Sequence, residues 1–239
     1  MLHGFTGSPA DFATLAAAGP RDESLKFFAP ALGGHFAEPA SASFEEEVER
    51  LAVIAPDATK LFGYSLGGRL ALGLIARHPG RFERAVVVSA HPGLHRESER
   101  ARRRLQDQRW TRLLRERGTS VFVSEWEQQA LWRTQRVLPK AVRAEKRRTR
   151  NLHDAEGLAR SLESVGLGQM PDLRPQLARS RCMVDFLAGS EDRKFLSLAR
   201  EMQRLLPRAS LGVAAHAGHD LVLERPEFCS AYLGQRDCR

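Results

Sequence analysis

Two hydrophobic patterns alternate along most of this chain. Short runs of consecutive apolar residues predict buried strands at 81–90 ("RFERAVVVSA"), 59–64 ("TKLFGY") and 27–32 ("FFAPAL"), and strand–loop units at 181–192 and 209–220. Segments with helical spacing lie at 40–55, 66–79, 194–207 and 226–235, and Ser43 is placed to cap the first of these. The start, "MLHGFTGS", reads as the end of a strand that runs into a glycine-containing loop. Strands that alternate with helices predict an α/β fold with a mostly parallel sheet and helices on both faces.

The pattern changes between Leu94 and Leu177. Helical, arginine-rich segments follow one another there, and no run of residues favours a strand. We interpret this part as a helical cap inserted above the carboxyl ends of the strands, where open α/β sheets bind ligands. The expected organisation is a first part of the core at 1–93, the cap at 94–177 and a second part of the core at 178–239.

A serine stands where the 59–64 strand must turn into the following helix. The stretch Gly63-Tyr64-Ser65-Leu66-Gly67 matches G-x-S-x-G, in which small neighbours let a strained turn lift the serine hydroxyl above the sheet edge. The amino end of the next helix favours negative charge that develops beside this serine. Ser65 is therefore the candidate nucleophile or base.

A serine hydroxyl needs a neighbour that takes its proton. Asp192 and His219 each follow a predicted strand, in the chain order Ser, acid, His. Glu191 competes with Asp192, and His216 is the rival of His219. The N–H groups of Leu66 and of Phe5, the latter in the loop "LHGF", are the expected oxyanion hole.

The positive charge of the chain suggests a second possible function, nucleic-acid binding. The formal net charge is +8, and arginines concentrate between Arg96 and Arg150, as a nucleic-acid-binding module would require. Acidic residues are interspersed there and aromatic residues do not alternate with the basic ones, so we expect solvated helix faces and no nucleic-acid partner. No apolar stretch is long enough for a membrane span, and no secretory signal is seen. Three scattered cysteines form no disulfide framework or zinc pattern, and a cytoplasmic location is expected.

The motifs "LHGFTGS", "GYSLGGRLAL", "GSEDRKF" and "AGHDLVLERPEF" resemble those of the α/β-hydrolase superfamily across nearly the whole chain. The cap segments "SAHPGL", "RRRLQDQRW" and "FVSEWEQQALW" are similar to those of the MenH family, the 2-succinyl-6-hydroxy-2,4-cyclohexadiene-1-carboxylate synthases of menaquinone biosynthesis. That resemblance implies a cofactor-free, metal-free enzyme that eliminates pyruvate from an anionic small-molecule substrate bearing several carboxylates. It also implies a set of substrate-binding residues: Tyr64, Arg69, Arg103 and Trp126. Guanidinium groups suit this task because they bind carboxylates through two parallel hydrogen bonds.

Three hypotheses about the function remain open at this point. The first is a lyase in which the triad acts as a base, and the second is a carboxylic-ester or thioester hydrolase that forms an acyl-enzyme on the same serine. The third is a nucleic-acid-binding helical module built from residues 96–150. Members of the resembled family have further strands before the "LHGF" motif, whereas Met1 begins this sequence directly before it. The strand that carries the Phe5 loop is therefore expected to be almost absent, with the N-terminal strands missing. The oligomeric state is not predicted.

Overall fold

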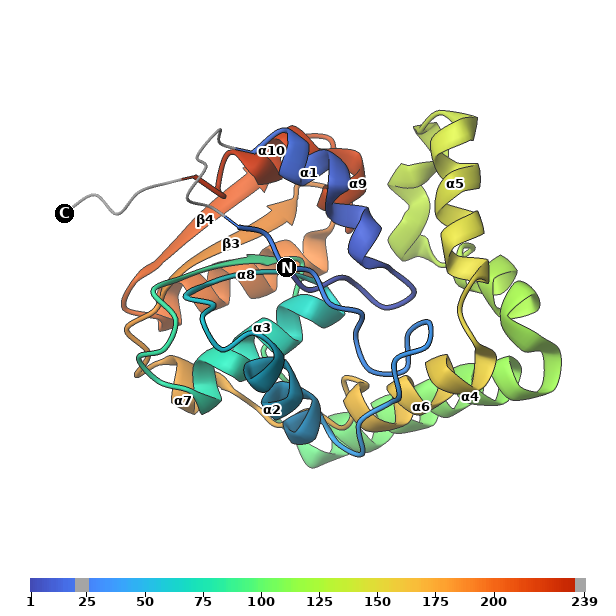
Figure 1. Cartoon of the computed structure of the whole chain (residues 1–239), viewed down its shortest axis with the longest axis horizontal. Coiled ribbons are helices and arrows are strands. Elements are labelled where there is room, and N and C mark those ends of the chain that lie inside the picture. Colours follow the sequence, from blue (N-terminus) through green and yellow to red (C-terminus); the bar gives the residue numbers. More distant parts are fainter. Residues whose placement is uncertain (20–25, 235–239) are drawn as a thin grey trace.

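A computed structural model describes residues 1–19 and 26–234 of the chain. Within these ranges one four-stranded parallel sheet is found, with strands in the order β1 (Lys60–Tyr64), β2 (Arg84–Val88), β3 (Met183–Gly189) and β4 (Ala209–Ala214). The α/β architecture expected from the alternating pattern is confirmed (Figure 1). Because all strands run the same way, their carboxyl ends lie at one edge of the sheet.

Helices cover both faces of this sheet (Figure 1). One face packs on α3 (Leu66–Arg77) and α8 (Arg193–Leu205), with α2 (Phe44–Ile54) and α7 (Arg174–Leu177) beside them. The other face is covered by short elements: η1 (Pro9–Phe12), α1 (Ala13–Ala17), α9 (Leu221–Glu224) and α10 (Pro226–Ser230). Every residue of β2 is buried, as expected for a strand that is covered on both sides. The Ser43 side chain accepts a hydrogen bond from Glu46 N–H at 3.1 Å and so caps α2 as predicted.

The first residues contribute little to the sheet. Leu2 forms an isolated parallel bridge with Gly63, which agrees with the expectation that the strand before the Phe5 loop is almost absent. The strand predicted at 27–32 is wrong, because this segment has no regular structure. Pro30 cannot donate a hydrogen bond to a neighbouring strand, and the carbonyl of Phe28 accepts from Met1 N at 2.6 Å. Cys238 and the end of the predicted 226–235 helix lie outside the described residues.

The chain between β2 and β3 is helical. It contains α4 (Glu97–Trp126), η2 (Ala130–Val137), α5 (Lys140–Asn151) and α6 (Ala155–Val165), followed by α7. The helix α4 is kinked at Gly118, whose φ of 76° is readily adopted by glycine. The helical segments before and after this residue therefore point in different directions. In Figure 1, α4, α5 and α6 lie to one side of the sheet, and α6 runs along α4. A separate apolar cluster, centred on Leu114, Phe122 and Leu158, holds α4 and α6 together.

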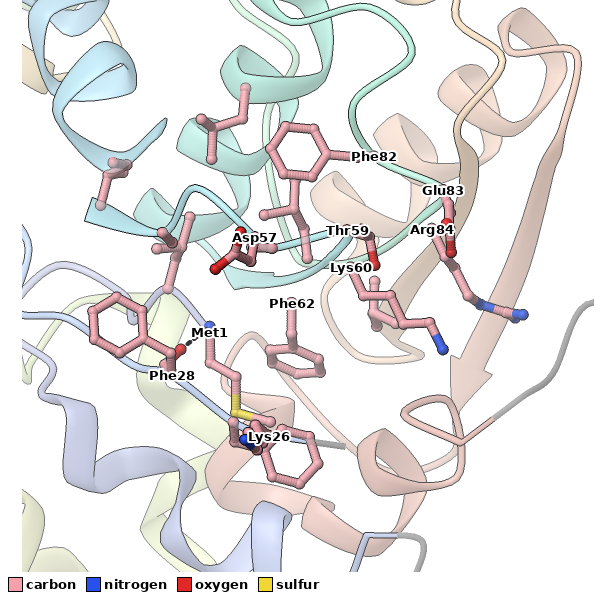
Figure 2. Close-up of a pocket in the computed structure, with 18 of the residues that line it drawn as sticks. Met1, Lys26, Phe28, Asp57, Thr59, Lys60, Phe62, Phe82, Glu83 and Arg84 are labelled. Carbon is pink, nitrogen blue, oxygen red and sulfur yellow. Dashed lines mark hydrogen bonds between the residues drawn. The ribbon is translucent and has the colours of Figure 1, made fainter. Parts of the chain in front are cut away.

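A cavity of about 720 Å³ opens beside β1 (Figure 2). Its labelled lining includes Met1, Phe28, Lys60, Phe62 and Arg84. Lys60 and Arg84 begin β1 and β2, so much of the cavity lies toward the amino ends of these strands. Ser65 follows the carboxyl end of β1 and is not part of the lining. No helix in the described ranges combines the length and the apolar character that crossing a bilayer requires.

Candidate active site

Ser65 occupies a strained turn between β1 and α3. Its φ of 51° lies in the left-handed region that non-glycine residues rarely adopt. A Cβ atom on Gly63 would lie 2.4 Å from the carbonyl oxygen of Gly67, and one on Gly67 would lie 2.0 Å from that of Leu2. The two glycines of the motif are therefore required because backbone passes directly over backbone at this turn.

His219 and Asp192 meet Ser65 at the carboxyl edge of the sheet. The Nε2 atom of His219 lies 3.0 Å from Ser65 Oγ, and its Nδ1 atom lies 2.7 Å from Asp192 Oδ2. Because a carboxylate can only accept, Nδ1 carries the proton and Nε2 is free to accept from the serine hydroxyl. The imidazole and the carboxylate are both buried, so water does not compete strongly for either.

The backbone around Asp192 and His219 fixes this arrangement. Asp192 caps α8, and its Oδ1 atom accepts from Phe195 N–H at 3.3 Å. The Phe195 ring lies 4.5 Å from the His219 ring. The sequence alternatives lie elsewhere: Glu191 is exposed and pairs with Arg133 at 3.5 Å, and His216 is an exposed residue with a φ of 51°.

The expected oxyanion donors, Phe5 and Leu66, belong to segments that are joined directly. Gly67 N–H donates to the His3 carbonyl at 3.0 Å, which ties the first turn of α3 to the loop that carries Phe5. In the described part of the chain, neither the Phe5 nor the Leu66 N–H donates to an acceptor. Both amides are thus available to an oxygen bound near Ser65.

Tyr64 and Trp126 border this region in different ways. The Tyr64 ring lies 5.6 Å from the His219 ring, and its hydroxyl is buried without a hydrogen-bond partner among the described residues. Burial raises the pKa of Tyr64 well above its usual value, so the hydroxyl stays protonated and can donate. The Trp126 ring contacts the Phe5 ring at 5.4 Å and stacks on Phe122 at 5.3 Å. Trp126 therefore reaches the site through Phe5, and also through Trp132, whose ring lies 6.2 Å from the Trp126 ring.

Arg69 and Arg103 approach each other from α3 and α4. Burial, with the nearby positive charge of Arg103, lowers the pKa of Arg69 to about 9. Arg69 donates to the Val165 carbonyl at 2.6 Å but pairs with no carboxylate in the described chain, whereas Arg103 Nε lies 2.9 Å from Asp107 Oδ1. Burial also raises the pKa of Asp107. A half-buried guanidinium without a carboxylate partner is prepared to receive an anion.

Three residues near the site were not predicted from the sequence: Trp132, Phe195 and Arg150. The Trp132 ring lies 5.6 Å from the His219 ring, and the Arg150 guanidinium lies 5.1 Å from the Trp132 ring centre. Arg150 is buried and pairs with Glu127 at 2.8 Å, whereas its neighbours Arg147 and Arg148 are exposed. The "RRTR" run gives no signal that its last arginine points inward, because helix packing decides this. A tryptophan within a strongly charged segment was the available clue to Trp132.

Metal and cofactor sites were not expected from the sequence. Among residues 1–19 and 26–234, no group of three or more histidine, cysteine, aspartate or glutamate side chains is arranged to hold a metal ion. The prediction that the reaction needs neither a metal nor a cofactor stays a prediction.

Comparison with known proteins adds to this geometry. The model of a family described as "Alpha/beta hydrolase family" matches residues 1–231. The chain is 31% identical to the 2-succinyl-6-hydroxy-2,4-cyclohexadiene-1-carboxylate synthase of Enterobacter sp. (strain 638), over 98% of this chain and 89% of that protein. It is 34% identical to the protein of the same name from Salmonella agona (strain SL483), over 95% of this chain and 88% of that protein.

A solved structure described as MenH from S. aureus superposes with a TM-score of 0.90 at 29% identity, covering 98% of this chain and 90% of that one. These comparisons agree with the parallel sheet and its covering helices. The chain therefore belongs to the alpha/beta hydrolase family and is an enzyme of that superfamily.

Proposed function

We propose that this enzyme is a 2-succinyl-6-hydroxy-2,4-cyclohexadiene-1-carboxylate synthase of menaquinone biosynthesis, which eliminates pyruvate from a polycarboxylate cyclohexene precursor. The observation that carries the proposal is the hydrogen-bonded chain Ser65–His219–Asp192, at 3.0 and 2.7 Å, in a protein similar to synthases of that name. Two neighbouring arginines, Arg69 on the helix that follows Ser65 and Arg103 on α4, support a substrate with several carboxylates.

The first step is proton transfer. His219 accepts the Ser65 proton, and the Ser65 alkoxide removes a carbon-bound proton from the substrate. Asp192 keeps the imidazole in the required tautomer and stabilises the imidazolium that forms. Burial of both side chains strengthens this pairing because little water screens it.

The second step is loss of the leaving group. The electron pair of the broken C–H bond moves through the ring and breaks the carbon–oxygen bond to the leaving group. That group departs as the enolate of pyruvate and takes a proton from His219. Ser65 keeps the proton that it removed from carbon, so the enzyme returns to its starting state without an acyl intermediate. The amides of Phe5 and Leu66 stabilise the substrate oxygen on which charge develops.

Substrate binding completes the proposal. We place the substrate between the carboxyl edge of the sheet and the helical segment 94–177, which acts as a cap. Arg69 and Arg103 hold carboxylates, Tyr64 donates from its buried hydroxyl, and Trp126 supports the Phe5 loop. A guanidinium that is partly removed from water binds a carboxylate more strongly than an exposed one would.

The test measures pyruvate release from the menaquinone precursor by the wild-type enzyme and by Ser65→Ala. We expect turnover by the wild type and no detectable release by the variant, whose unfolding curve shows that it is folded. Near-normal release by Ser65→Ala would contradict the base role of Ser65. If the wild type releases no pyruvate but a simple activated ester acylates Ser65, the enzyme is a hydrolase that uses the same three residues.

A further inference from the structure

Three buried histidines surround the loop that carries Phe5. His3 belongs to this loop, His35 to the loop that precedes α2, and His153 to the turn between α5 and α6. Their rings form a row, with centroids 4.9 Å apart from His3 to His35 and 5.2 Å apart from His35 to His153. The Phe5 ring packs against His35 at 5.6 Å. The three side chains are almost fully buried, and the proton-transfer chain at Ser65 does not use them.

Two of the histidines join the loops reciprocally. His3 Nε2 accepts from Leu32 N–H at 3.2 Å, and His35 Nε2 accepts from Thr6 N–H at 3.3 Å. In each ring the Nδ1 atom faces a carbonyl oxygen, that of Gly4 at 2.9 Å and that of Gly33 at 3.2 Å, so Nδ1 carries the proton. Each loop therefore supplies one ring that accepts a backbone N–H of the other. Protonation of either Nε2 atom would turn this acceptor into a donor and break the link.

Two of the three backbone amides that donate to these rings belong to strained residues. Thr6 has a φ of 62° and donates to His35, and Phe36 has a φ of 55° and donates to His153 Nδ1 at 3.4 Å. Non-glycine residues hold such conformations only where their surroundings fix them. Thr6 directly follows Phe5, so the ring that holds Thr6 also sets the direction of the peptide next to the expected oxyanion donor.

The surroundings keep the three rings neutral. Burial lowers the pKa of His3 and of His153 to about 4 and lowers that of His35 well below its usual value. The charged groups that face the row are Asp11 from η1 and Lys146 from α5, which pair with each other at 2.7 Å. Asp11 favours the protonated imidazoles and Lys146 opposes them, but burial is the largest effect and keeps the rings neutral.

We propose that His3, His35 and His153 are positioning residues that, as neutral imidazoles, lock the Phe5 N–H beside Ser65 and connect that loop to the helical segment above it. The connection passes through the loop before α2. His35 in that loop accepts from Thr6 N–H, the neighbouring Phe36 N–H donates to the His153 ring, and the His153 carbonyl accepts from the hydroxyl of Thr119 on α4 at 3.0 Å. This inference rests on the proposed role of Phe5 as an oxyanion donor. The new element is that the three neutral histidines, and not the Phe5 loop alone, keep the oxyanion hole in place.

The test compares His35→Leu, which removes the acceptor, with His35→Gln, whose amide oxygen lies at nearly the same reach as Nε2. Steady-state pyruvate release is measured for both. We expect kcat to fall roughly 10- to 100-fold in His35→Leu, less than the loss of a whole donor, with KM changed by no more than about twofold. His35→Gln should recover most of kcat. A buried apolar residue of α7, outside the row of histidines, provides a matched control: Leu177→Ala should lower the unfolding midpoint but leave kcat unchanged.

The outcomes separate this inference from the proposed function. If the wild type releases no pyruvate, the proposed function fails, and the same comparison is made with hydrolysis of an activated ester, which uses the same amides. If the wild type is active and folded His35→Leu keeps wild-type kcat, the positioning role is wrong. It is also wrong if Leu177→Ala loses as much kcat as His35→Leu. Should His35→Leu fail to fold, His153→Leu and His153→Asn replace the pair, because the asparagine oxygen lies at nearly the same reach as the Nδ1 atom that accepts from Phe36 N–H. Equal kcat for these two variants would overturn the proposal.

Discussion

Replacing Asp192 with asparagine tests the site most sharply, because the change is isosteric and its effect follows from two hydrogen bonds. Asp192 Oδ1 accepts from Phe195 N–H, and Oδ2 accepts from His219 Nδ1. Asparagine has one acceptor oxygen. If this oxygen stays with the Phe195 amide, the –NH₂ group faces His219 and can only donate to it. The imidazole then moves its proton to Nε2, where it donates to Ser65 instead of accepting from it.

We expect kcat for pyruvate release by Asp192→Asn to fall about 10³- to 10⁴-fold, as in other triads whose histidine is held in the wrong tautomer. This loss equals about 4 to 5.5 kcal/mol of transition-state stabilisation. The free energy of unfolding should fall by no more than about 1–2 kcal/mol, since a neutral hydrogen bond to His219 replaces a charge-assisted one and the cap of α8 remains. Stopped assays that couple pyruvate to a reporter enzyme cover this range, provided that contaminating wild type is excluded by mass spectrometry.

The matched control is Glu191→Gln, which changes the neighbouring acid in the same way. Glu191 is exposed and pairs only weakly with Arg133, so kcat should stay within about twofold of the wild type. A folded Asp192→Asn enzyme with kcat within tenfold of the wild type would refute the tautomer argument. So would an equal loss in Glu191→Gln.

Three other changes have distinct expected results. Arg69→Met should raise KM for the precursor roughly 10- to 100-fold, because a charged hydrogen-bond donor is lost, while Arg77→Met at the exposed end of α3 should not; KM values that match would exclude a carboxylate contact. Gly67→Ala should lower the free energy of unfolding by at least about 1–3 kcal/mol in urea titrations, since its Cβ would collide with the Leu2 carbonyl; an unchanged midpoint would contradict the close approach. Acid should destabilise the fold between pH 6.5 and about 4, because burial lowers the pKa of His3 and His153 to about 4 and the unfolded chain therefore binds protons first. Each buried histidine then lowers the free energy of unfolding by up to about 1.4 kcal/mol per pH unit. If urea titrations at pH 7, 5.5 and 4.5 give the same free energy of unfolding, this expectation is wrong.

The sequence was sufficient where function depends on local backbone chemistry. The glycines around Ser65 and the positions of Asp192 and His219 after strands predicted which side chains meet, because parallel strands bring their carboxyl ends to one edge. The strand prediction at 27–32 was wrong because a short apolar run does not show whether a neighbouring strand is available to pair with it. Arg150 and the row of His3, His35 and His153 could not be predicted, since their burial depends on contacts between segments far apart in the sequence.

The insertion of the helical segment between β2 and β3 also determines when the sheet can form. The central ion pair of the sheet joins Arg84 to Asp185 at 2.8 Å, across 101 positions of the chain. Closing such a span costs about 4 kcal/mol of chain entropy before any pairing compensates for it. Two strands alone are at best marginally stable in water, so β1 and β2 gain a lasting partner only when β3 arrives. During synthesis, the edge of β2 that pairs with β3 therefore stays open until β3 leaves the ribosome, while the intervening helices, whose contacts are more local, can assemble first.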